Sequence, residues 1–555
     1  MKGLLPCLIL GLFFCQLTTG QKTVDFDIVI YAATPAGLTA AIGAAMNSPE
    51  LSIAIVEPEL NFGGMVVSGG IGLRDLGEPN SFGGLGLAWT MMNAKHYNVS
   101  YPVYQPDMYI GDENWKAMLG AHPSIKLVYN QPLLLTKEGV EMDGTRITSI
   151  LTGDAVSTAT KWQAKVFIDA SYEGDVMRMA GVSYTFGREA SSTYNESYGG
   201  VMKYTETGNF LKSNPVSALK DGKLVPFVNP GPLQPVGSAD DKMMGYSYRL
   251  CITNNKENMM PFPKPKNYNP DDFIMLQRYL DSLVSSRKYP DGPPFNYLVD
   301  VLAYRSYPHR NKWDLCDSAR SAFTSDVINL NAGYANGTRE EREQIAHKHH
   351  DYLAGYLTYL STNESVPSYT KASTNSYGLC KDEWPYNSNW PKQFYVREAA
   401  RLVGERVTSQ NDLVGGKCTT DSIGVGSWGL DIHVVQRVAV PGPTSGSMIA
   451  DNEGQLARTI VEGKGRVYEL SYSLLLPKKT EATNLLVPVC HSASHVAYSS
   501  TRVEPTFIQL GQASGVAATL AIKESVAVHD IDLPALQKIL ESQDMLLHYP
   551  KGSCQ

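Results

Sequence analysis

The start of the chain alternates between short apolar runs and a helix-like stretch of small residues. The apolar runs cover Asp27–Tyr31 and Ser52–Val56, and the small-residue stretch between them covers Leu38–Met46. Short apolar runs are typical of buried parallel strands, and small side chains let a helix pack closely on such a sheet. The pattern therefore predicts an α/β segment over residues 24–190. Further elements expected there are hairpin-like stretches at Lys126–Leu135, Gly139–Met142 and Ile147–Leu151 and a buried strand at Lys165–Asp169.

The pattern changes between about residues 190 and 400, where Pro, Asn, Tyr and Gly become frequent. Prolines at this density interrupt regular elements, whereas the aromatic residues among them favour a folded region over a linker. We interpret this region as a loop-rich cap domain that contains one long amphipathic helix, Arg339–Leu360. After it we expect a helix at Arg401–Leu413, a strand at Asn484–Val489, a loop rich in Ser, His and Arg, and a helix at Pro505–Lys523.

The first twenty residues have the outline of a secretory signal peptide. Lys2 precedes an apolar run from Leu4 to Phe14, which is short for a membrane span, although a retained signal anchor is the alternative. No later apolar stretch is long enough to predict a stable membrane association. Four N-x-S/T sequences fit a secreted glycoprotein; they begin at Asn98, Asn195, Asn336 and Asn363.

Length, charge and cysteine content narrow the class of protein. A chain of 555 residues is too long to fold around a single hydrophobic core, so we expect two or three domains. The net charge of −7 argues against a nucleic-acid partner, because phosphate binding needs a basic surface. Because no C-x-x-C pair occurs, the cysteines point to neither a zinc knuckle nor a thioredoxin-like redox site. Six cysteines follow the signal peptide, and their pairing stays open: Cys251, Cys316, Cys380, Cys418, Cys490 and Cys554.

Residues 28–45, IVIYAATPAGLTAAIGAA, run from strand through a tight turn into helix, the layout of a dinucleotide-binding unit. Such turns usually carry G-x-G-x-x-G; aligned on Gly37, the other glycine positions hold Ala32 and Thr34. Gly37 permits close helix–strand packing, Ala32 is the smallest replacement, and Thr34 adds bulk but also a hydroxyl donor. Glu57 stands twenty residues after Gly37, where an acid binds ribose hydroxyls in these folds. The turn and Glu57 together favour a nucleotide site over an ordinary βα corner.

Two glycine pairs, Gly63-Gly64 and Gly69-Gly70, follow the acid-ended strand in NFGGMVVSGGIGLRDLG, residues 61–77. Glycine at this density lets backbone lie against a flat ligand, although a flexible surface loop is the alternative. The apolar residues between and after the pairs indicate burial; they are Met65, Val66, Val67 and Ile71.

These stretches also carry a family resemblance. DIVIYAATPAGLTAAIGAA, IVEP and FGGMVVSGGIGLRDLG resemble the opening of a family of FAD-dependent oxidoreductases with a glutathione-reductase-like flavin fold. That family has Thr-Pro-Ala-Gly in the turn, so Thr34 matches it, whereas Ala32 stands where the family usually has glycine. Later segments resemble further family segments in the same order: 167–189, 246–268, 378–405, 421–433 and 484–522.

The resemblance implies an α/β fold, with a discontinuous Rossmann-like FAD-binding domain and a loop-rich α+β cap that holds the substrate. After a signal peptide at 1–20, the FAD domain would comprise residues 21–190 and 401–535, and the cap residues 191–400. A C-terminal tail, 536–555, would follow. The substrate would bind between the cap and the flavin, because domain interfaces commonly form pockets.

The same resemblance implies which residues bind FAD. Pro505 opens a helix whose N-terminus would point at the flavin and stabilise its reduced, anionic form. Asp169, Ala170 and Ser171 match the family's second flavin segment. The candidates are Ala32, Thr34, Pro35, Ala36, Gly37, Glu57, Gly63, Gly64, Met65, Ser68, Gly69, Asp169, Ala170, Ser171, Glu504 and Pro505.

Polar residues of the family-like segments are the candidates for chemistry. His495 suits proton transfer or substrate orientation near the flavin, or else it supports the cofactor loop. Arg502 suits a substrate carboxylate or sugar hydroxyl, or else it pairs with Glu504. His433 is the third catalytic candidate. Two arginines are candidate anion holders from the cap: Arg249 and Arg397.

Three histidines, His347, His349 and His350, stand close together in the predicted cap helix. Their spacing resembles a metal-ligand cluster, but the helix is charged and no cysteine is near. We therefore predict a solvated helix face and no metal site.

We expect a secreted FAD-dependent oxidoreductase. It would transfer a hydride from a C–H bond beside a hydroxyl or amine of a small-molecule or carbohydrate-like substrate to the flavin. Oxygen is the expected acceptor outside the cell. Two alternatives stay open: a redox-neutral lyase or isomerase that uses FAD on a polysaccharide, and a glycoprotein that kept the fold but lost the cofactor.

Overall fold

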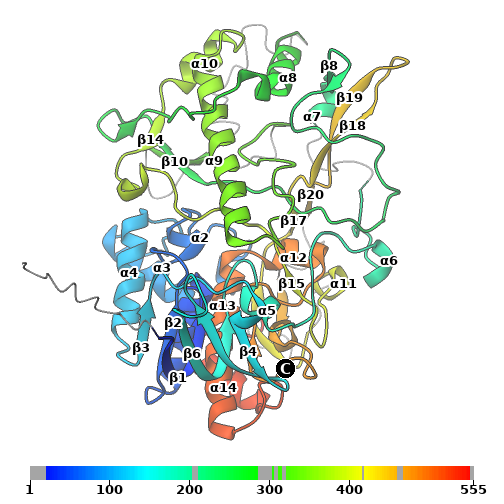
Figure 1. Cartoon of the computed structure of the whole chain (residues 1–555). Helices are drawn as coiled ribbons and strands as arrows, with labels where there is room; N and C mark the ends of the chain where they lie inside the picture. Colours follow the sequence, from blue (N-terminus) through cyan, green and yellow to red (C-terminus); the bar gives the residue numbers. More distant parts are fainter. Residues whose placement is uncertain are drawn as a thin grey trace, which may run out of the picture.

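The structure is a computed structural model that describes residues 20–202, 210–285, 303–305, 311–315, 321–414, 418–458 and 467–550. All but the last residue of the expected signal peptide, and the end of the expected tail, lie outside the described residues. Two parts stand one above the other (Figure 1). A largely parallel sheet with its helices forms the lower part, and a smaller antiparallel sheet crossed by a long helix forms the cap.

The main sheet is built around strand β1 (Lys22–Tyr31), whose two neighbours run parallel to it. These neighbours are β2 (Ile53–Val56) and β6 (Thr160–Asp169). A strand from the far end of the chain, β22 (Leu485–Leu486), pairs in parallel with the end of β6, so this domain is discontinuous, as predicted. Among the described residues the sheet order is β3 (Ile125–Val128), β2, β1, β6, β5 (Arg146–Thr152) and β4 (Val140–Asp143), and the β6–β5 and β5–β4 pairs are antiparallel.

Side chains of β1 alternate between two apolar cores. Ile28 and Ile30 contribute to a core that includes residues of helices α1 (Pro35–Asn47) and α13 (Glu504–Glu524). Val29 and Tyr31 contribute to a second core on the other face of the sheet. Because both faces are buried, the strand reads as an uninterrupted apolar run.

Helices α1 and α13 pack so closely that their backbones are in direct contact. A Cβ atom on Gly511 would lie 2.2 Å from the carbonyl oxygen of Ala36. Across the same contact, the hydroxyl of Thr39 donates to the carbonyl of Ile508 at 2.9 Å. This packing holds the C-terminal helix beside the N-terminal turn. Further helices of the lower part are α2 (Gly64–Val67), α3 (Gly84–His96), α4 (Met108–Gly120), α5 (Asp175–Met179), α12 (His495–Thr501) and α14 (Leu533–Ser542).

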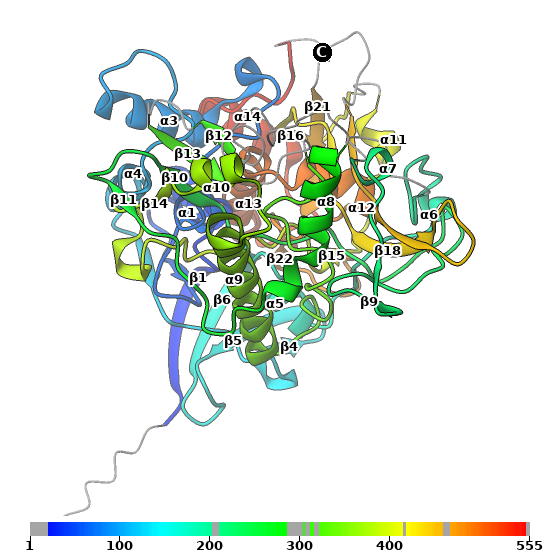
Figure 2. The ribbon, with the colours of Figure 1, turned by 90° about the horizontal axis from the view of Figure 1, so that it is seen from above.

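The cap contains the predicted long helix, α9 (Arg339–Thr362), which begins with a capping box of Thr338 and Glu341. Figures 1 and 2 both place α9 in the middle of the cap. Arg342 donates to the Asp175 carboxylate of the lower part at 2.9 and 3.0 Å, so the start of α9 anchors the cap. In the described residues the cap sheet has the order β11 (Met259–Met260), β14 (Gly378–Cys380), β10 (Leu250–Thr253), β13 (Lys312–Leu315) and β12 (Ala303–Arg305). Other cap helices are α7 (Phe210–Ser213), α8 (Ile274–Ser285) and α10 (Ser368–Thr374).

Part of the expected C-terminal FAD segment lies with the cap. The hairpin of β18 (Gln436–Pro441) and β19 (Met448–Glu453) projects upward beside β8 (Leu219–Lys220) in Figure 1. Ile449 of this hairpin forms a bridge with Ser217 of the cap. The chain therefore returns to the cap before α12 and α13 complete the lower part.

The predicted helix at Arg401–Leu413 is wrong. Its first residues form a short strand, β15 (Arg401–Leu402), and only α11 (Gln410–Leu413) is helical. The strand forms because β15 pairs with β7 (Tyr184–Thr185), while the Arg401 guanidinium is buried between Glu189 and Glu398.

Two other expectations also need correction. Lys126–Leu135 is no hairpin, because β3 pairs in parallel with β2. Residues 495–501, expected as a loop, form α12, because Ser494 accepts a hydrogen bond from the backbone N–H of Ala497 and caps the helix. The hairpin of β4 and β5 and the C-terminal helix α13 are confirmed.

The described cysteines include both bonded and free thiols. Cys251 and Cys380 form a disulfide that links β10 to β14. Cys418 is disulfide-bonded as well, and Cys490 is a buried free thiol. Cys316 and Cys554 lie outside the described residues. Of the helices in the described ranges, none is both long and apolar enough to cross a membrane.

Two substitutions in the first βα turn should act in opposite directions. Ala32 adopts a φ of 74°, which costs an L-residue about 1–2 kcal/mol, so Ala32→Gly should raise the free energy of unfolding by up to about 1 kcal/mol and leave FAD content unchanged or slightly raised. Gly37→Ala should lower the free energy of unfolding by about 1–3 kcal/mol, because its Cβ would lie 2.1 Å from the Ala32 carbonyl oxygen. Denaturant unfolding measures both changes. A marked loss of FAD in Ala32→Gly would contradict this account of the turn.

Candidate functional site

The turn between β1 and α1 is held by a side chain rather than by glycines alone. Thr34 caps α1, accepting from the backbone N–H of Gly37 at 3.3 Å. The Thr34 hydroxyl donates to the carbonyl of Ala170 at 2.8 Å and so ties the turn to the end of β6. Pro35 and Ala36 form the buried first residues of α1. The Thr34 hydroxyl therefore stabilises the turn itself, whereas the sequence indicated only that it adds a hydrogen-bond donor.

A cleft of about 300 Å³ opens beside this turn. Ala32, Thr34 and Glu57 line it from the lower part, and Arg339 and His347 line it from α9 of the cap. The Glu57 carboxylate accepts from the backbone N–H groups of residues 33 and 59 at 2.7 and 2.8 Å. Burial raises the pKa of Glu57 to about 8, although these hydrogen bonds oppose the shift. Other lining residues include Gly64, Pro132, Leu133, Ser171, Tyr172, Glu173 and Phe394.

The glycine-rich loop continues the cleft wall. Gly63 and Gly64 adopt φ values of 84° and 45°, which confirms that this backbone needs glycine. A Cβ on Gly64 would lie 2.5 Å from the Tyr172 hydroxyl, which accepts from the backbone N–H of Met65 at 2.9 Å. Further along, Ser68 donates to the carbonyl of Phe62 at 2.8 Å, and Gly69 is packed against the Met65 side chain. The loop is thus folded and buried.

Tyr172 joins this loop to the C-terminal helix. Its hydroxyl donates to Oε1 of Glu504 at 2.6 Å, while Oε2 of Glu504 is buried without a hydrogen-bond partner. Burial raises the pKa of Glu504 to about 8. Glu504 and Pro505 open α13, whose N-cap residue supplies no side-chain hydrogen bond. The first turn of α13 thus lies at the glycine-rich loop, as the flavin-contact prediction requires.

Asp169 has a structural task in the described geometry. Its carboxylate accepts from the backbone N–H and hydroxyl of Ser171 and from the backbone N–H of Met177. It is fully buried, and burial raises its pKa to about 6. Ser171 lines the cleft, and the carbonyl of Ala170 accepts from Thr34. Asp169 therefore fixes the backbone that holds these two residues in place.

Arg502 and His433 are brought together by one carboxylate. Asp431 lies 3.4 Å from Arg502 Nη2 and 3.4 Å from His433 Nε2. The other imidazole nitrogen, Nδ1, lies 2.7 Å from Asp326. The nearby His433 and Arg502 hold the pKa of Asp431 well below its usual range, although burial opposes this. Arg502 is not paired with Glu504 in this geometry.

Residues of the cap complete this cluster. Arg397 binds Asp326 at 2.7 Å and lies over the ring of Tyr395, 4.4 Å from its centroid. The Tyr395 hydroxyl accepts from Arg502 Nη1 at 3.1 Å, so one tyrosine joins cap and lower part. Arg249 is paired with Asp314 of β13.

Sequence reasoning missed Tyr395 and Asp75, two members of this cluster. Burial raises the pKa of Asp75, and the guanidinium groups of Arg249, Arg74 and Arg502 oppose the shift. Asp75 lies in the glycine-rich loop, within LRDLG. An acidic residue directly after a glycine-rich loop was a signal from which this member of the cluster could have been predicted. Tyr395 carries no local signal, because its role comes only from the arginines that the fold gathers around it.

His495 belongs to a different cluster. Its Nδ1 lies 2.9 Å from Glu398, whose other contacts include Arg401, and its Nε2 is buried without a hydrogen-bond partner. His495 and Arg502 lie at opposite ends of α12, which separates them by about 10 Å along the axis. The three catalytic candidates therefore do not converge on one point.

The three cap histidines do not form a cluster. His349 is buried, its Nδ1 donates to the Ile345 carbonyl at 2.7 Å, and burial lowers its pKa to about 4. The expected solvated face is therefore wrong at this residue, because α9 passes through the cap core. His350 contacts Asp351, and His347 lines the cleft.

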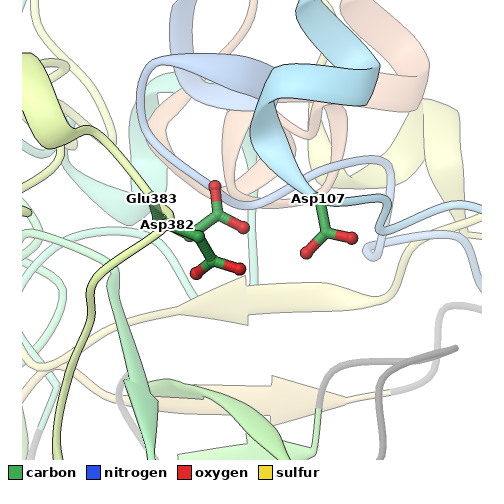
Figure 3. A group of neighbouring side chains, drawn as sticks. All are labelled: Asp107, Asp382 and Glu383. Atoms are coloured by element: carbon green, nitrogen blue, oxygen red, sulfur yellow. The ribbon is translucent and has the colours of Figure 1, made fainter. Parts of the chain in front are cut away.

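A group of three carboxylates does occur in the described residues, at a position the sequence did not suggest. Asp382 and Glu383 stand side by side on one cap loop, and Asp107 faces them from the start of α4 (Figure 3). The ammonium group of Lys312 binds all three, at 2.8 Å from Asp382 and 2.9 Å from Glu383. Lys312 thus supplies the cation for these carboxylates and joins the cap to the lower part.

Comparison with known proteins shows that the sequence of this chain matches one protein family. The family model described as FAD dependent oxidoreductase matches residues 27–540. The chain belongs to this family. It is an oxidoreductase whose cofactor is FAD. No curated protein matches the sequence.

The solved structures that this chain resembles share little of its sequence. A mutant of quinol fumarate reductase FrdA from E. coli has 10% identity and a TM-score of 0.31, with 94% of this chain and 74% of that chain covered. L-proline dehydrogenase from P. horikoshii has 15% identity and a TM-score of 0.18, with 31% of this chain covered. The match to that dehydrogenase spans only 25% of its length. Thioredoxin reductase of T. acidophilum has 19% identity and a TM-score of 0.17, with 31% and 40% covered.

The residues around the cleft fit FAD. Gly37 lets α1 begin within reach of the cleft, and Glu57 places a carboxylate where the adenosine ribose is expected. The buried, unpartnered Oε2 of Glu504 offers a polar contact at the start of α13. If FAD binds in this cleft, the turn with Glu57 would hold its adenosine end and the start of α13 would contact its flavin end.

The raised pKa of Glu504 gives a testable pH dependence. Its folded pKa of about 8 lies above the unfolded value, so its burial costs little stability below pH 4.5 and progressively more up to pH 8. Glu504→Gln should therefore match the wild type near pH 5 and exceed it by a few kcal/mol at pH 9. Urea unfolding at pH 5, 7 and 9 measures the difference.

Glu257→Gln is the matched control, because Glu257 is exposed and should show no such trend. A constant difference between Glu504→Gln and the wild type over this range would contradict the assignment of a protonated Glu504 at neutral pH.

Proposed function

We propose that this protein oxidises a hydroxylated, carbohydrate-like small molecule in the secretory pathway or outside the cell, with oxygen as the electron acceptor. The observation that carries the proposal is the cluster of arginines, aspartates and Tyr395 where the cap meets the start of α13. FAD, when bound, accepts the hydride from the substrate. The residues of the chain bind the substrate, orient it and take up its proton.

The charge balance of this cluster favours a neutral polar substrate. Among the described side chains, every arginine in the cluster has an aspartate near it, so no excess cation is left for a dianionic substrate. Hydroxyl groups of a sugar or polyol suit such paired donors and acceptors, since each can donate to a carboxylate and accept from a guanidinium. The cluster comprises Arg74, Arg249, Arg397 and Arg502 with Asp75, Asp314, Asp326 and Asp431.

Two groups suit the proton of the substrate hydroxyl. Asp75 lies beside Arg249 and Arg502, and burial raises its pKa, which makes its carboxylate a better proton acceptor than an exposed aspartate. His495, at the other end of α12, is the second candidate, because its Nε2 is buried without a hydrogen-bond partner; it would serve a substrate bound beside Glu398 and not one held by the arginine–aspartate cluster. His433 is held on both nitrogens by carboxylates and serves to position Asp431 and, through it, Arg502.

Several features support the secretory location. The N-terminal segment has the pattern of a signal peptide, and the disulfide between Cys251 and Cys380 requires an oxidising compartment. Three of the four candidate glycosylation asparagines are exposed: Asn98, Asn195 and Asn336.

The substrate class can be tested on the holoprotein without oxygen. Anaerobic addition of sugars and polyols should bleach the flavin absorbance, and readmission of oxygen should restore it with release of hydrogen peroxide. Bleaching by dicarboxylates or amines alone would overturn the proposed substrate class. Turnover of a saccharide without flavin bleaching or oxygen uptake would instead favour the redox-neutral alternative.

Arg502→Lys should lower kcat/KM for the substrate by about a hundredfold, because a lysine does not make the two contacts to Tyr395 and Asp431 at once. FAD content should stay unchanged. Arg146→Lys is the control, because Arg146 is exposed on β5. A kcat/KM equal to that of the wild type in Arg502→Lys would show that this cluster does not bind the substrate.

A further inference from the structure

A second cavity lies on the other side of the segment that lines the cofactor cleft. It has a volume of about 350 Å³, and Asn61 is the one described residue that lines both spaces. Its walls come from the segment around Phe62, from α4 and from the cap loop that carries Asp382 and Glu383. The proposed oxidation does not use this cavity. The lining side chains include Leu60, Phe62, Tyr109, Asp112, Lys116, Tyr129, Asp382, Glu383, Trp384 and Tyr386.

Aromatic side chains at the rim are unusually exposed. Tyr386 is 65% exposed and Tyr109 is 47% exposed, although tyrosine normally packs against other side chains. Phe62 and Tyr129 pair deeper in the cavity, with ring centroids 6.4 Å apart. The cap loop that presents Tyr386 is held firmly, because the indole N–H of Trp384 donates to the Val67 carbonyl at 3.3 Å. The aromatic faces therefore belong to fixed elements.

The cavity carries an excess of negative charge. The described side chains that line it include three carboxyl groups, those of Asp112, Asp382 and Glu383, and one ammonium group, that of Lys116, which pairs with Asp112. Burial raises the pKa of Glu383 to about 7, although Lys312 opposes the shift, so the negative charge lies mainly on the two aspartates. Behind the wall, Lys312 is shared by three carboxylates, as Figure 3 shows for the carboxylate partners, and so does not neutralise them.

The tyrosines report the same negative field. Partial burial and the nearby Asp112 raise the pKa of both Tyr129 and Tyr386 to about 12. Both side chains therefore stay neutral at physiological pH and keep the electron-rich ring faces that attract cations.

One ammonium group already uses these walls. Lys116 Nζ lies 2.6 Å from Asp112 and 5.6 Å from the centroid of the Phe62 ring. Aromatic faces beside carboxylates are the usual means of binding alkylated ammonium ions. A metal ion does not need a space of this size, and a neutral saccharide would gain nothing from the excess charge.

We propose that this cavity binds a small organic cation with an alkylated ammonium group, held between the tyrosine rings and the carboxylates. The site is distinct from the cofactor cleft and independent of the proposed oxidation. Its ligand would contact Phe62, Val67 and Ser68 of the same segment whose Asn61 and Gly64 line the cofactor cleft.

A matched pair of probes separates charge from shape. Choline and its neutral carbon analogue, in which carbon replaces the nitrogen, are titrated into the holoprotein by calorimetry. Choline should bind at least about tenfold more tightly than the analogue, because only the cation gains from the rings and carboxylates. Equal affinities, or no binding of choline, would overturn the proposal. Binding of neutral oligosaccharides in place of choline would overturn it as well.

Variants place the binding in this cavity. Tyr386→Ala should abolish measurable choline binding, whereas Tyr386→Phe should retain it, since the ring face and not the hydroxyl is required. Asp112→Asn should weaken binding. Tyr369→Ala, on α10, is the control, because this tyrosine is 45% exposed and does not line the cavity. Unchanged choline binding in Tyr386→Ala, with circular dichroism as in the wild type, would refute the assignment.

Discussion

The close contact between α1 and α13 is the constraint on which the rest of the structure depends. Added Cβ atoms at Gly511 and Gly515 would lie 2.2 and 1.9 Å from backbone oxygens of α1. Only glycine fits at such distances. The contact joins the two ends of the chain, and it brings Glu504 to the glycine-rich loop that follows the nucleotide-binding turn. Without this contact, nothing would hold the start of α13 beside the nucleotide-binding turn.

Around this contact the fold gathers buried carboxyl groups whose pKa values are raised. Glu57 and Glu504 have pKa values of about 8 and Glu173 of about 7, in each case chiefly through burial. Partly protonated acids carry less negative charge than ionised ones, which would favour an anionic cofactor in the cleft that Glu57 and Glu173 line. The ion pairs at the cap junction serve a different purpose. Lys312 and Arg342 bind carboxylates of the lower part and fix the cap over the cleft.

The sequence predicted the parts of the fold that local pattern controls. The apolar run of β1, the small residues of α1 and Glu57 after β2 were sufficient to predict the parallel βαβ unit and the FAD cofactor, whereas the individual FAD contacts stay a prediction. The motifs of residues 484–522 predicted the C-terminal helix. Arg401–Leu413 was misjudged as a helix because tertiary ion pairs to Glu189 and Glu398 override its local preference.

The arginine–aspartate cluster was harder to predict, because its members come from distant segments. Arg502 and His433 were foreseen as single residues, but their link through Asp431 depends on the folded chain. Tyr395 matters only because Arg397 and Arg502 surround it. His495 looked equivalent to Arg502 in the sequence, yet the length of α12 separates them. Proximity of this kind has no signature in one sequence.

The FAD dissociation constant of Gly511→Ala tests the central claim most directly. A methyl group at this position forces α13 away from α1, so deflavinated Gly511→Ala should bind FAD roughly tenfold or more weakly than the wild type, with circular dichroism retained. Gly120→Ala is the control, because a Cβ there meets no atom within 4 Å. Wild-type FAD affinity in a folded Gly511→Ala variant would contradict the claim that this helix contact builds the cofactor site.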